Sequence, residues 1–196
     1  MPTKLGAELQ RPTEITTVSS AVAKLITPFW DICRLKQAPQ DIPESRFLFN
    51  IVLCAYLLLG TTINLIGFPI AEACMLSLLM TALLLLVIRT LLQLRGYTGR
   101  MLQTATAIMG TSIVLFLPAF GLRFWFYVIE KSGTESNLAG YIWICLFVWE
   151  RFISAHILRH ALGTRLLVGF FISIAYVFLE FQVVVIFHHA LGQWLV

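Results

Sequence analysis

Apolar residues dominate five stretches of this 196-residue chain, and short polar segments separate them. Each stretch is about 20 residues long, which is the length at which an α-helix crosses the roughly 30 Å hydrocarbon core of a bilayer. The pattern predicts an all-α membrane protein, with a five-helix transmembrane bundle as the domain over residues 47–196. The expected spans cover about residues 47–66, 70–92, 101–122, 138–157 and 165–187.

Residues 1–46 form the other predicted domain, a cytoplasmic tail with an amphipathic helix and a proline-containing linker. Apolar residues recur at helical spacing between residues 15 and 35, with an interruption or kink at Pro28. Nearby basic and aromatic side chains suit a helix that lies in the membrane interface. These interface candidates are Lys24, Trp30, Arg34 and Lys36. A tail that packs on the protein's own cytoplasmic face fits the pattern equally well.

The third expected span differs from the others because small and hydroxyl residues interrupt its apolar pattern. Such residues let helix backbones approach closely in lipid, so we expect this helix to be central in the bundle. Pro118 removes one backbone hydrogen bond and predicts a kink near the far end of the span. An aromatic cluster that includes Trp125 and Tyr127 then predicts a membrane interface, followed by a polar loop over residues 130–137.

Composition and charge support the membrane class. The chain is 59% hydrophobic and 12% charged, whereas soluble domains are about 45–50% apolar and about 25% charged. Of the 14 Lys and Arg residues, eleven fall on the side of the N-terminal tail, two (Arg123 and Lys131) on the opposite side, and Arg151 within a span. This bias predicts a cytoplasmic N-terminus and, with five spans, a periplasmic or extracellular C-terminus.

Three ionisable residues lie inside the fourth and fifth spans: Glu150, Arg151 and Glu180. Charged groups at this depth are costly and usually face protein. One interpretation is a proton- or substrate-handling carboxylate pair with Arg151 as the counter-ion. The other is a structural clamp, in which Arg151 reaches Glu180 directly or through water. Glu150 then faces the bundle or a partner, because neighbouring residues point about 100° apart on a helix.

No other pattern in the chain predicts catalysis or a cofactor. His156 and His160 share a helix face, but no third ligand is near in sequence and Arg159 would oppose a cation. The cysteines are widely spaced and most lie in apolar runs, which is typical of small buried residues. The basic residues stand at segment ends and form no patch for nucleic acid. We therefore expect no catalytic, cofactor-binding or metal-binding residues.

The layout of the chain resembles the Yip domain family of small membrane proteins. The similar region runs from Phe29-Trp30 through Asp41-Ile42-Pro43 and then over the spans at residues 47–187. Eukaryotic members carry an Asp-Leu-Tyr-Gly-Pro motif before their spans, and only Asp41-Ile42-Pro43 is similar to it here. The short loops look closer to bacterial members. The resemblance implies a five-helix inner-membrane protein and no catalytic residues.

Two functional hypotheses follow from these patterns. The first is a non-enzymatic accessory, assembly or scaffold subunit of a larger membrane complex. Its expected partners are the lipid bilayer and other membrane subunits or further copies of the chain, with no nucleic acid. The alternative is a small oligomeric transporter or permease that uses the intramembrane Glu and Arg residues.

Overall fold

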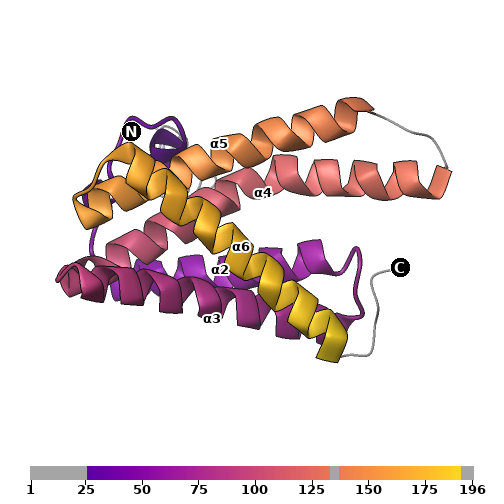
Figure 1. The fold of residues 1–196 in the computed structure, drawn as a ribbon, viewed down its shortest axis with the longest axis horizontal. Helices are drawn as coiled ribbons and strands as arrows, with labels where there is room; N and C mark the ends of the chain where they lie inside the picture. Colours follow the sequence, from indigo (N-terminus) through magenta and orange to yellow (C-terminus); the bar gives the residue numbers. More distant parts are fainter. Residues whose placement is uncertain (1–25, 133–136, 191–196) are drawn as a thin grey trace, which may run out of the picture.

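A computed structural model of the chain describes residues 26–132 and 137–190, and this described part contains helices and no strand. Five of its helices are long and apolar enough to cross a membrane. They are α2 (Arg46–Asn64), α3 (Ile70–Leu94), α4 (Met101–Ser132), α5 (Asn137–Leu162) and α6 (Leu166–Ala190) (Figure 1). The expected all-α fold is confirmed, and the protein is a polytopic membrane protein.

Successive helices run in opposite directions, and local chemistry sets where they begin and end (Figure 1). The Ser45 hydroxyl accepts a hydrogen bond from the backbone N–H of Leu48 and caps the start of α2. Pro69 precedes α3, and Glu72 lies in its first turn, where the helix macrodipole favours a carboxylate. Gly163 follows α5 with a φ of 61°, the left-handed conformation common just after a helix.

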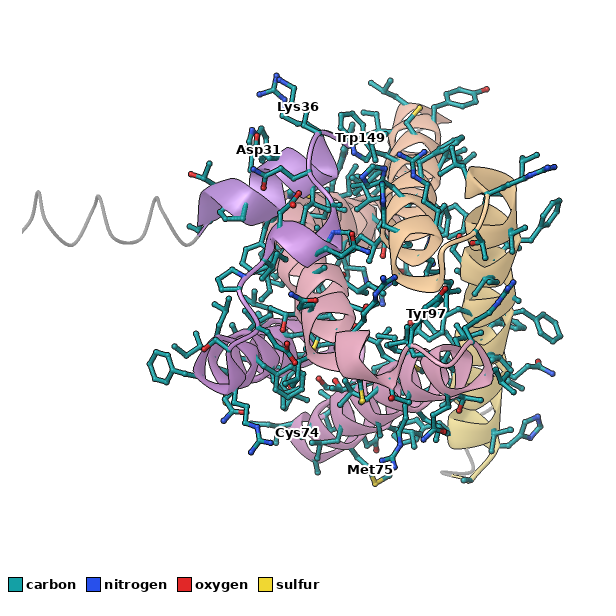
Figure 2. All side chains as sticks on the ribbon, turned by 90° about the vertical axis from the view of Figure 1, so that its left-hand side faces the viewer. Asp31, Lys36, Cys74, Met75, Tyr97 and Trp149 are labelled. Atoms are coloured by element: carbon teal, nitrogen blue, oxygen red, sulfur yellow. The ribbon has the colours of Figure 1, made fainter. Side chains whose placement is uncertain are left out.

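The bundle has two ends with different chemistry. We call the end where α2, α4 and α6 begin and α3 and α5 finish the basic end, and the opposite one the far end. The basic end faces the viewer in Figure 2. An arginine lies in the terminal turn of each of the five helices there, or directly beside it: Arg46, Arg95, Arg100, Arg159 and Arg165.

The contiguous hydrophobic core lies in the half of the bundle near the basic end. Its buried residues come from the end of α3 (residues 84–92), the start of α4 (residues 105–109) and the end of α5 (residues 153–162). Val52 of α2 and several residues before α2 complete it. The far half has only separate buried side chains, such as Leu122 and Phe187. The two halves of the same helices are therefore packed differently.

Helix α4 is the most buried span: 44% of the residues in its most apolar 18-residue segment are buried inside the protein. Its small residues make this possible: the buried set is Thr104, Ala105, Thr106, Ala107, Met109, Gly110, Thr111 and Leu122. Helices α2, α3 and α5 all pack against α4, so its predicted central position agrees with the structure. Pro118 lies inside the helix, and α4 changes direction near its middle in Figure 1.

The end of α4 departs from the sequence-based expectation. We expected the span to stop near residue 122 and a loop to begin at residue 130, but the helix continues to Ser132. Residues 133–136 lie outside the described part. The Phe126 ring contacts the Trp143 ring edge-on with centroids 6.1 Å apart, so α5 supports this last part of α4. The α4–α5 hairpin consequently extends beyond the α2–α3 turn in Figure 1.

Residues 26–42, which we call the strap, pack against α4 and α5 near the basic end. Residues 26–33 are helical with Pro28 among them, and the short helix η1 (Pro39–Asp41) follows. The helical part lies crosswise to the spans (Figures 1 and 2). Ile32 and Ile42 are 0% and 1% exposed. The Phe29 ring lies over Gly110 of α4, in space that any Cβ on Gly110 would need.

The strap agrees with the alternative in which the tail packs on the protein itself, and its contact with the membrane interface stays a prediction. Its apolar face packs on the protein, and on its other side Trp30, Arg34 and Lys36 are exposed at the basic end. Lys24, the fourth interface candidate on the tail, lies outside the described residues. Trp125 and Tyr127, the far-end candidates, are exposed on the last turns of α4.

Candidate intramembrane polar site

Arg151 occupies the middle of α5 and is 5% exposed. Its Nη2 lies 2.6 Å from Glu150 Oε1, and its Nη1 donates a hydrogen bond of 3.3 Å to the backbone carbonyl of Ser173 on α6. The Ser173 hydroxyl donates back to the Arg151 carbonyl at 3.5 Å. The guanidinium is thus held by a carboxylate of its own helix and by the backbone of the next one.

A cavity beside Arg151 collects polar side chains from α2, α4, α5 and α6 against an apolar wall from α3. We call it the inner cavity, and its volume is about 50 Å³. Its polar lining consists of Tyr56, Ser112, Glu150, Arg151, Ser154, Ser173, Tyr176 and Glu180. All five spans contribute to the wall, so the cavity exists only when the whole bundle is assembled.

The structure brings Glu150, Arg151 and Glu180 to one cavity but does not form the direct Arg151–Glu180 ion pair expected from the sequence. Arg151 pairs with Glu150 instead. The Cβ atoms of neighbouring helix residues point about 100° apart, but the long Arg151 side chain can fold back toward Glu150. Water-mediated contact between Arg151 and Glu180 stays a prediction. The Arg151 Nε has no hydrogen-bond partner among the described residues.

A second hollow adjoins the inner cavity on the side of the far end. We call it the outer cleft, and its volume is about 230 Å³. Residues of α2, α4 and α5 line it, and Tyr56, Ser112 and Glu150 belong to both hollows. The Glu150 side chain is 39% exposed, in contrast to Arg151 beside it. Glu150 therefore stands between the inner cavity and the outer cleft, and lines both.

One contact of Arg123 marks the outer limit of this cleft. Its outermost lining residues on α2 and α4 are Ile63 and Ala119. One helical turn beyond them, the Arg123 side chain reaches the α2–α3 turn, where a Cβ built on Gly67 would lie 3.3 Å from Nη2. Arg123 therefore lies beyond the outermost residues of the cleft, beside the α2–α3 turn.

Hydrogen bonds connect the strap to the same region. Five of them join it to α4 and α5: Trp149 Nε1 to the Cys33 carbonyl (3.2 Å), His156 Nε2 to the Gln37 carbonyl (3.0 Å), Gln40 Nε2 to the His160 carbonyl (3.0 Å), Gln103 Nε2 to the Ile42 carbonyl (3.0 Å) and Cys33 Sγ to the Thr111 carbonyl (3.9 Å). Trp149 precedes Glu150 directly and lies at the strap in Figure 2. The strap therefore contacts the helix turn that carries the ion pair.

The remaining residues considered for metal or redox chemistry are two histidines and the four cysteines. The rings of His156 and His160 pack edge-on with centroids 4.8 Å apart. No group of three or more His, Cys, Asp or Glu residues that could hold a metal ion occurs among the described residues. Cys33 is buried in the strap, and Cys54, Cys74 and Cys145 are exposed on the spans; none of the four is in a disulfide.

Sequence reasoning missed five polar members of the inner cavity: Tyr56, Ser112, Ser154, Ser173 and Tyr176. The signal available for the tyrosines was their position. Both lie well inside an apolar span, away from the ends where aromatic belts normally place tyrosine. The serines carry no comparable signal, because a hydroxyl inside a span usually returns its hydrogen bond to the helix backbone, as Ser173 does to Phe170.

The chain matches no protein-family model, and no curated protein or solved structure is significantly similar to it. The functional argument therefore rests on the geometry of the inner cavity and the outer cleft alone.

Proposed function

We propose that this protein is a small, non-enzymatic transport protein that moves protons or small cations across the membrane. The observation that carries the proposal is the gathering of Glu150, Arg151 and Glu180 around one cavity that all five spans build. Ionisable residues at membrane depth that face a shared interior cavity are typical of ion and proton pathways. Charges turned outward would instead have favoured pairing with another subunit.

Charge and size support this substrate class. When both carboxylates are ionised, they and the guanidinium give the inner cavity a net charge of about −1, and a proton taken up by Glu180 brings the sum to zero, so the cavity suits a proton or a small cation and not an anion. A water molecule needs about 10–15 Å³ of such cavity volume. The inner cavity, with about 50 Å³, therefore has room for a proton, a small ion or a few waters and for no larger solute. Arg151 neutralises Glu150 and leaves Glu180 as the carboxylate with no cationic partner among the described residues.

The packing also supports a direction of access. The outer cleft connects the Glu150 side of the cavity to the far half, while the contiguous hydrophobic core and the strap lie between the cavity and the basic end. With the N-terminus in the cytoplasm, as the basic residues predict, this conformation opens toward the periplasm or the outside. Transport then requires a second conformation that opens at the basic end, and a homo-oligomer remains the expected assembly because five helices enclose little volume.

Reconstitution into liposomes tests the proposal. We expect flux of protons or monovalent cations, driven by an imposed gradient, that Glu150→Gln and Glu180→Gln each abolish. Glu130→Gln, at the exposed tip of α4, is the matched control and should leave flux unchanged. Flux that survives both cavity substitutions, or its absence with every cation offered, would overturn the proposal.

One observation favours the accessory-subunit hypothesis as a second candidate. The α4–α5 hairpin extends beyond the other helices and exposes large apolar residues there, including Phe124, Val128 and Tyr141 at 55%, 46% and 65%. A membrane partner could cover this extension. Crosslinking from cysteines placed at Val128 and Tyr141 tests this in native membranes, with exposed Leu94 at the basic end as the control position. Adducts confined to the hairpin support a partner there.

The Yip-like layout and the inner-membrane location stay predictions that accompany this proposal. They are compatible with a transport protein and with an accessory subunit alike, so they do not decide between the two functions.

A further inference from the structure

We propose that the α5–α6 turn binds the phosphate group of an anionic phospholipid headgroup at the basic end. The site is a surface depression of about 470 Å³, which we call the basic depression. It is lined by Arg159, His160, Gly163, Thr164, Arg165 and Leu166. This inference is independent of the proposed transport function, because none of these residues lines the inner cavity or the outer cleft.

The positive charge of the basic depression is not used within the described structure. Arg159 and Arg165 form no ion pair with any described carboxylate. The ion pair found among the described residues joins Arg151 to Glu150, in the middle of α5. Arg159 and Thr164 are partly exposed, but the Arg159 Nε and the Thr164 hydroxyl are themselves covered, and neither has a hydrogen-bond partner among the described residues. A phosphate group, with several acceptor oxygens and negative charge, would satisfy both donors once the two side chains turn toward the depression.

The basic side chains are also not needed to finish α5. The last carbonyls of that helix are already bonded: Arg100 Nη1 donates to the carbonyls of His160 and Ala161 at 3.2 Å each. Gln40 donates to the His160 carbonyl as well. Figure 2 shows Tyr97, whose ring lies under the Arg100 guanidinium, close to this turn. Arg159 and Arg165 are therefore available for a ligand.

The backbone adds to the attraction for an anion. Gly163, with its φ of 61°, turns the chain so that α6 begins at the depression. The first amide groups of a helix have no acceptor within that helix, and the macrodipole makes its start positive. Arg165 and Leu166 stand at this start, beside the Thr164 hydroxyl. The helix start contributes here together with the buried unpartnered donors and is not the sole observation.

An apolar strip that leaves the depression along α6 favours a phospholipid over soluble phosphate. Leu167, Phe171, Ile174 and Phe178 follow one another at helical spacing and are 69%, 69%, 39% and 61% exposed. An acyl chain lying along this strip would begin beside the basic residues that hold its headgroup. Basic pockets at the cytoplasmic ends of membrane helices bind lipid headgroups by the same combination of charges and apolar surface.

Lipid binding to delipidated protein in detergent tests the proposal. Native mass spectrometry would count bound phosphatidylglycerol, with phosphatidylcholine and inorganic phosphate as separate arms. We expect phosphatidylglycerol to bind the full chain preferentially, and R159Q/R165Q to bind it about 30-fold more weakly. The matched control R89Q/R95Q removes two arginines near the same end that do not line the depression. It should bind like the wild type.

The substitution T164V keeps the test valid if the double variant does not fold, because it removes one hydroxyl and no charge. It should weaken phosphatidylglycerol binding by about 5–10-fold. Binding of inorganic phosphate as tight as that of the lipid would support the phosphate site and assign it to a soluble ligand. Equal loss in R159Q/R165Q and R89Q/R95Q, or no loss in T164V and R159Q/R165Q, would overturn the proposal.

Discussion

The two halves of the bundle use the same five helices but are held together in different ways. Near the basic end, a contiguous hydrophobic core, the strap and its five hydrogen bonds join segments far apart in the sequence. Toward the far end, the α4–α5 hairpin separates from α2, α3 and α6, with the outer cleft beside it (Figure 1).

This difference in packing indicates where the molecule can move. Local stability follows the density of buried contacts, so opening and closing should occur in the far half, while the basic half acts as a rigid base. The inner cavity lies at the boundary between these halves, at the level where α5 carries Glu150 and Arg151. A motion of the α4–α5 hairpin would therefore change the surroundings of Glu150 more than those of Glu180 on α6.

The substitution Gly169→Ala should have the largest effect. A Cβ on Gly169 would lie 2.5 Å from the backbone oxygen of Ala155, so α5 and α6 would have to separate in the basic half. Overpacking of this kind costs about 1–3 kcal/mol or more. The matched control Gly140→Ala, in the far half of α5, meets nothing within 4 Å and should gain up to about 1 kcal/mol from helix propensity. Thermal unfolding in detergent measures both, and equal midpoints would contradict the comparison.

A smaller effect, confined to the strap, is expected from Gly110→Val. The added side chain needs the space of the Phe29 ring, so the strap should detach while the five spans stay folded. Alkylation of Cys33, in a protein whose other three cysteines are replaced by serine, reports the release. Burial raises the Cys33 pKa from 9.0 to about 11, which lowers its thiolate fraction at pH 8 by about 100-fold.

Release of the strap should therefore speed alkylation at pH 8 by up to about 100-fold, because the thiolate is the reactive form. The raised pKa also fixes the sign of the pH dependence: in the docked strap the rate keeps rising toward pH 11, whereas the rate of a released thiol is half-maximal near pH 9.0 and levels off above it. Gly121→Val, on α4 where a Cβ meets nothing within 4 Å, is the control. Slow alkylation in Gly110→Val would show that the strap does not depend on this contact.

The smallest effect is expected from Trp149→Phe. This change removes the indole donor to the Cys33 carbonyl and keeps an aromatic ring, at a cost of about 0.5–1.5 kcal/mol. Cys33 alkylation at pH 8 should rise by about 2–10-fold, less than in Gly110→Val. Trp143→Phe makes the same chemical change in the far half, where the ring packs on Phe126, and should leave the rate unchanged. Identical rates of Cys33 alkylation in Trp149→Phe and Trp143→Phe would show that the Trp149 hydrogen bond does not hold the strap.

The sequence predicted the parts of the fold that hydropathy controls. The starts of the spans and the central position of α4 follow from apolar run length and small residues, and both agree with the structure. The extension of α4 to Ser132 was missed because Glu130 and Lys131 read as a loop, although a helix outside the bilayer tolerates charge. Hydropathy describes solvent preference and does not say whether a polar segment is helical.

The polar site was predictable in composition but not in pairing. Glu150, Arg151 and Glu180 stood out because charges are rare at membrane depth, and the structure places all three at one cavity. Which carboxylate Arg151 chooses depends on its rotamer and on the Ser173 carbonyl of α6, neither of which leaves a sequence signal. The docking of Phe29 over Gly110 is equally invisible, since it joins residues about 80 positions apart through shape alone.

The hydrogen bond from Trp149 to Cys33 also has a consequence for biosynthesis. The two residues are 116 positions apart, so at about 5–20 residues per second a ribosome needs about 6–23 s between them. During that interval α2, α3 and α4 can enter the bilayer, while the strap has no α5 to dock on. The segment of the described chain that emerges first is thus among the last to reach its native position, and its amphipathic face must be held meanwhile by the membrane surface or by a chaperone.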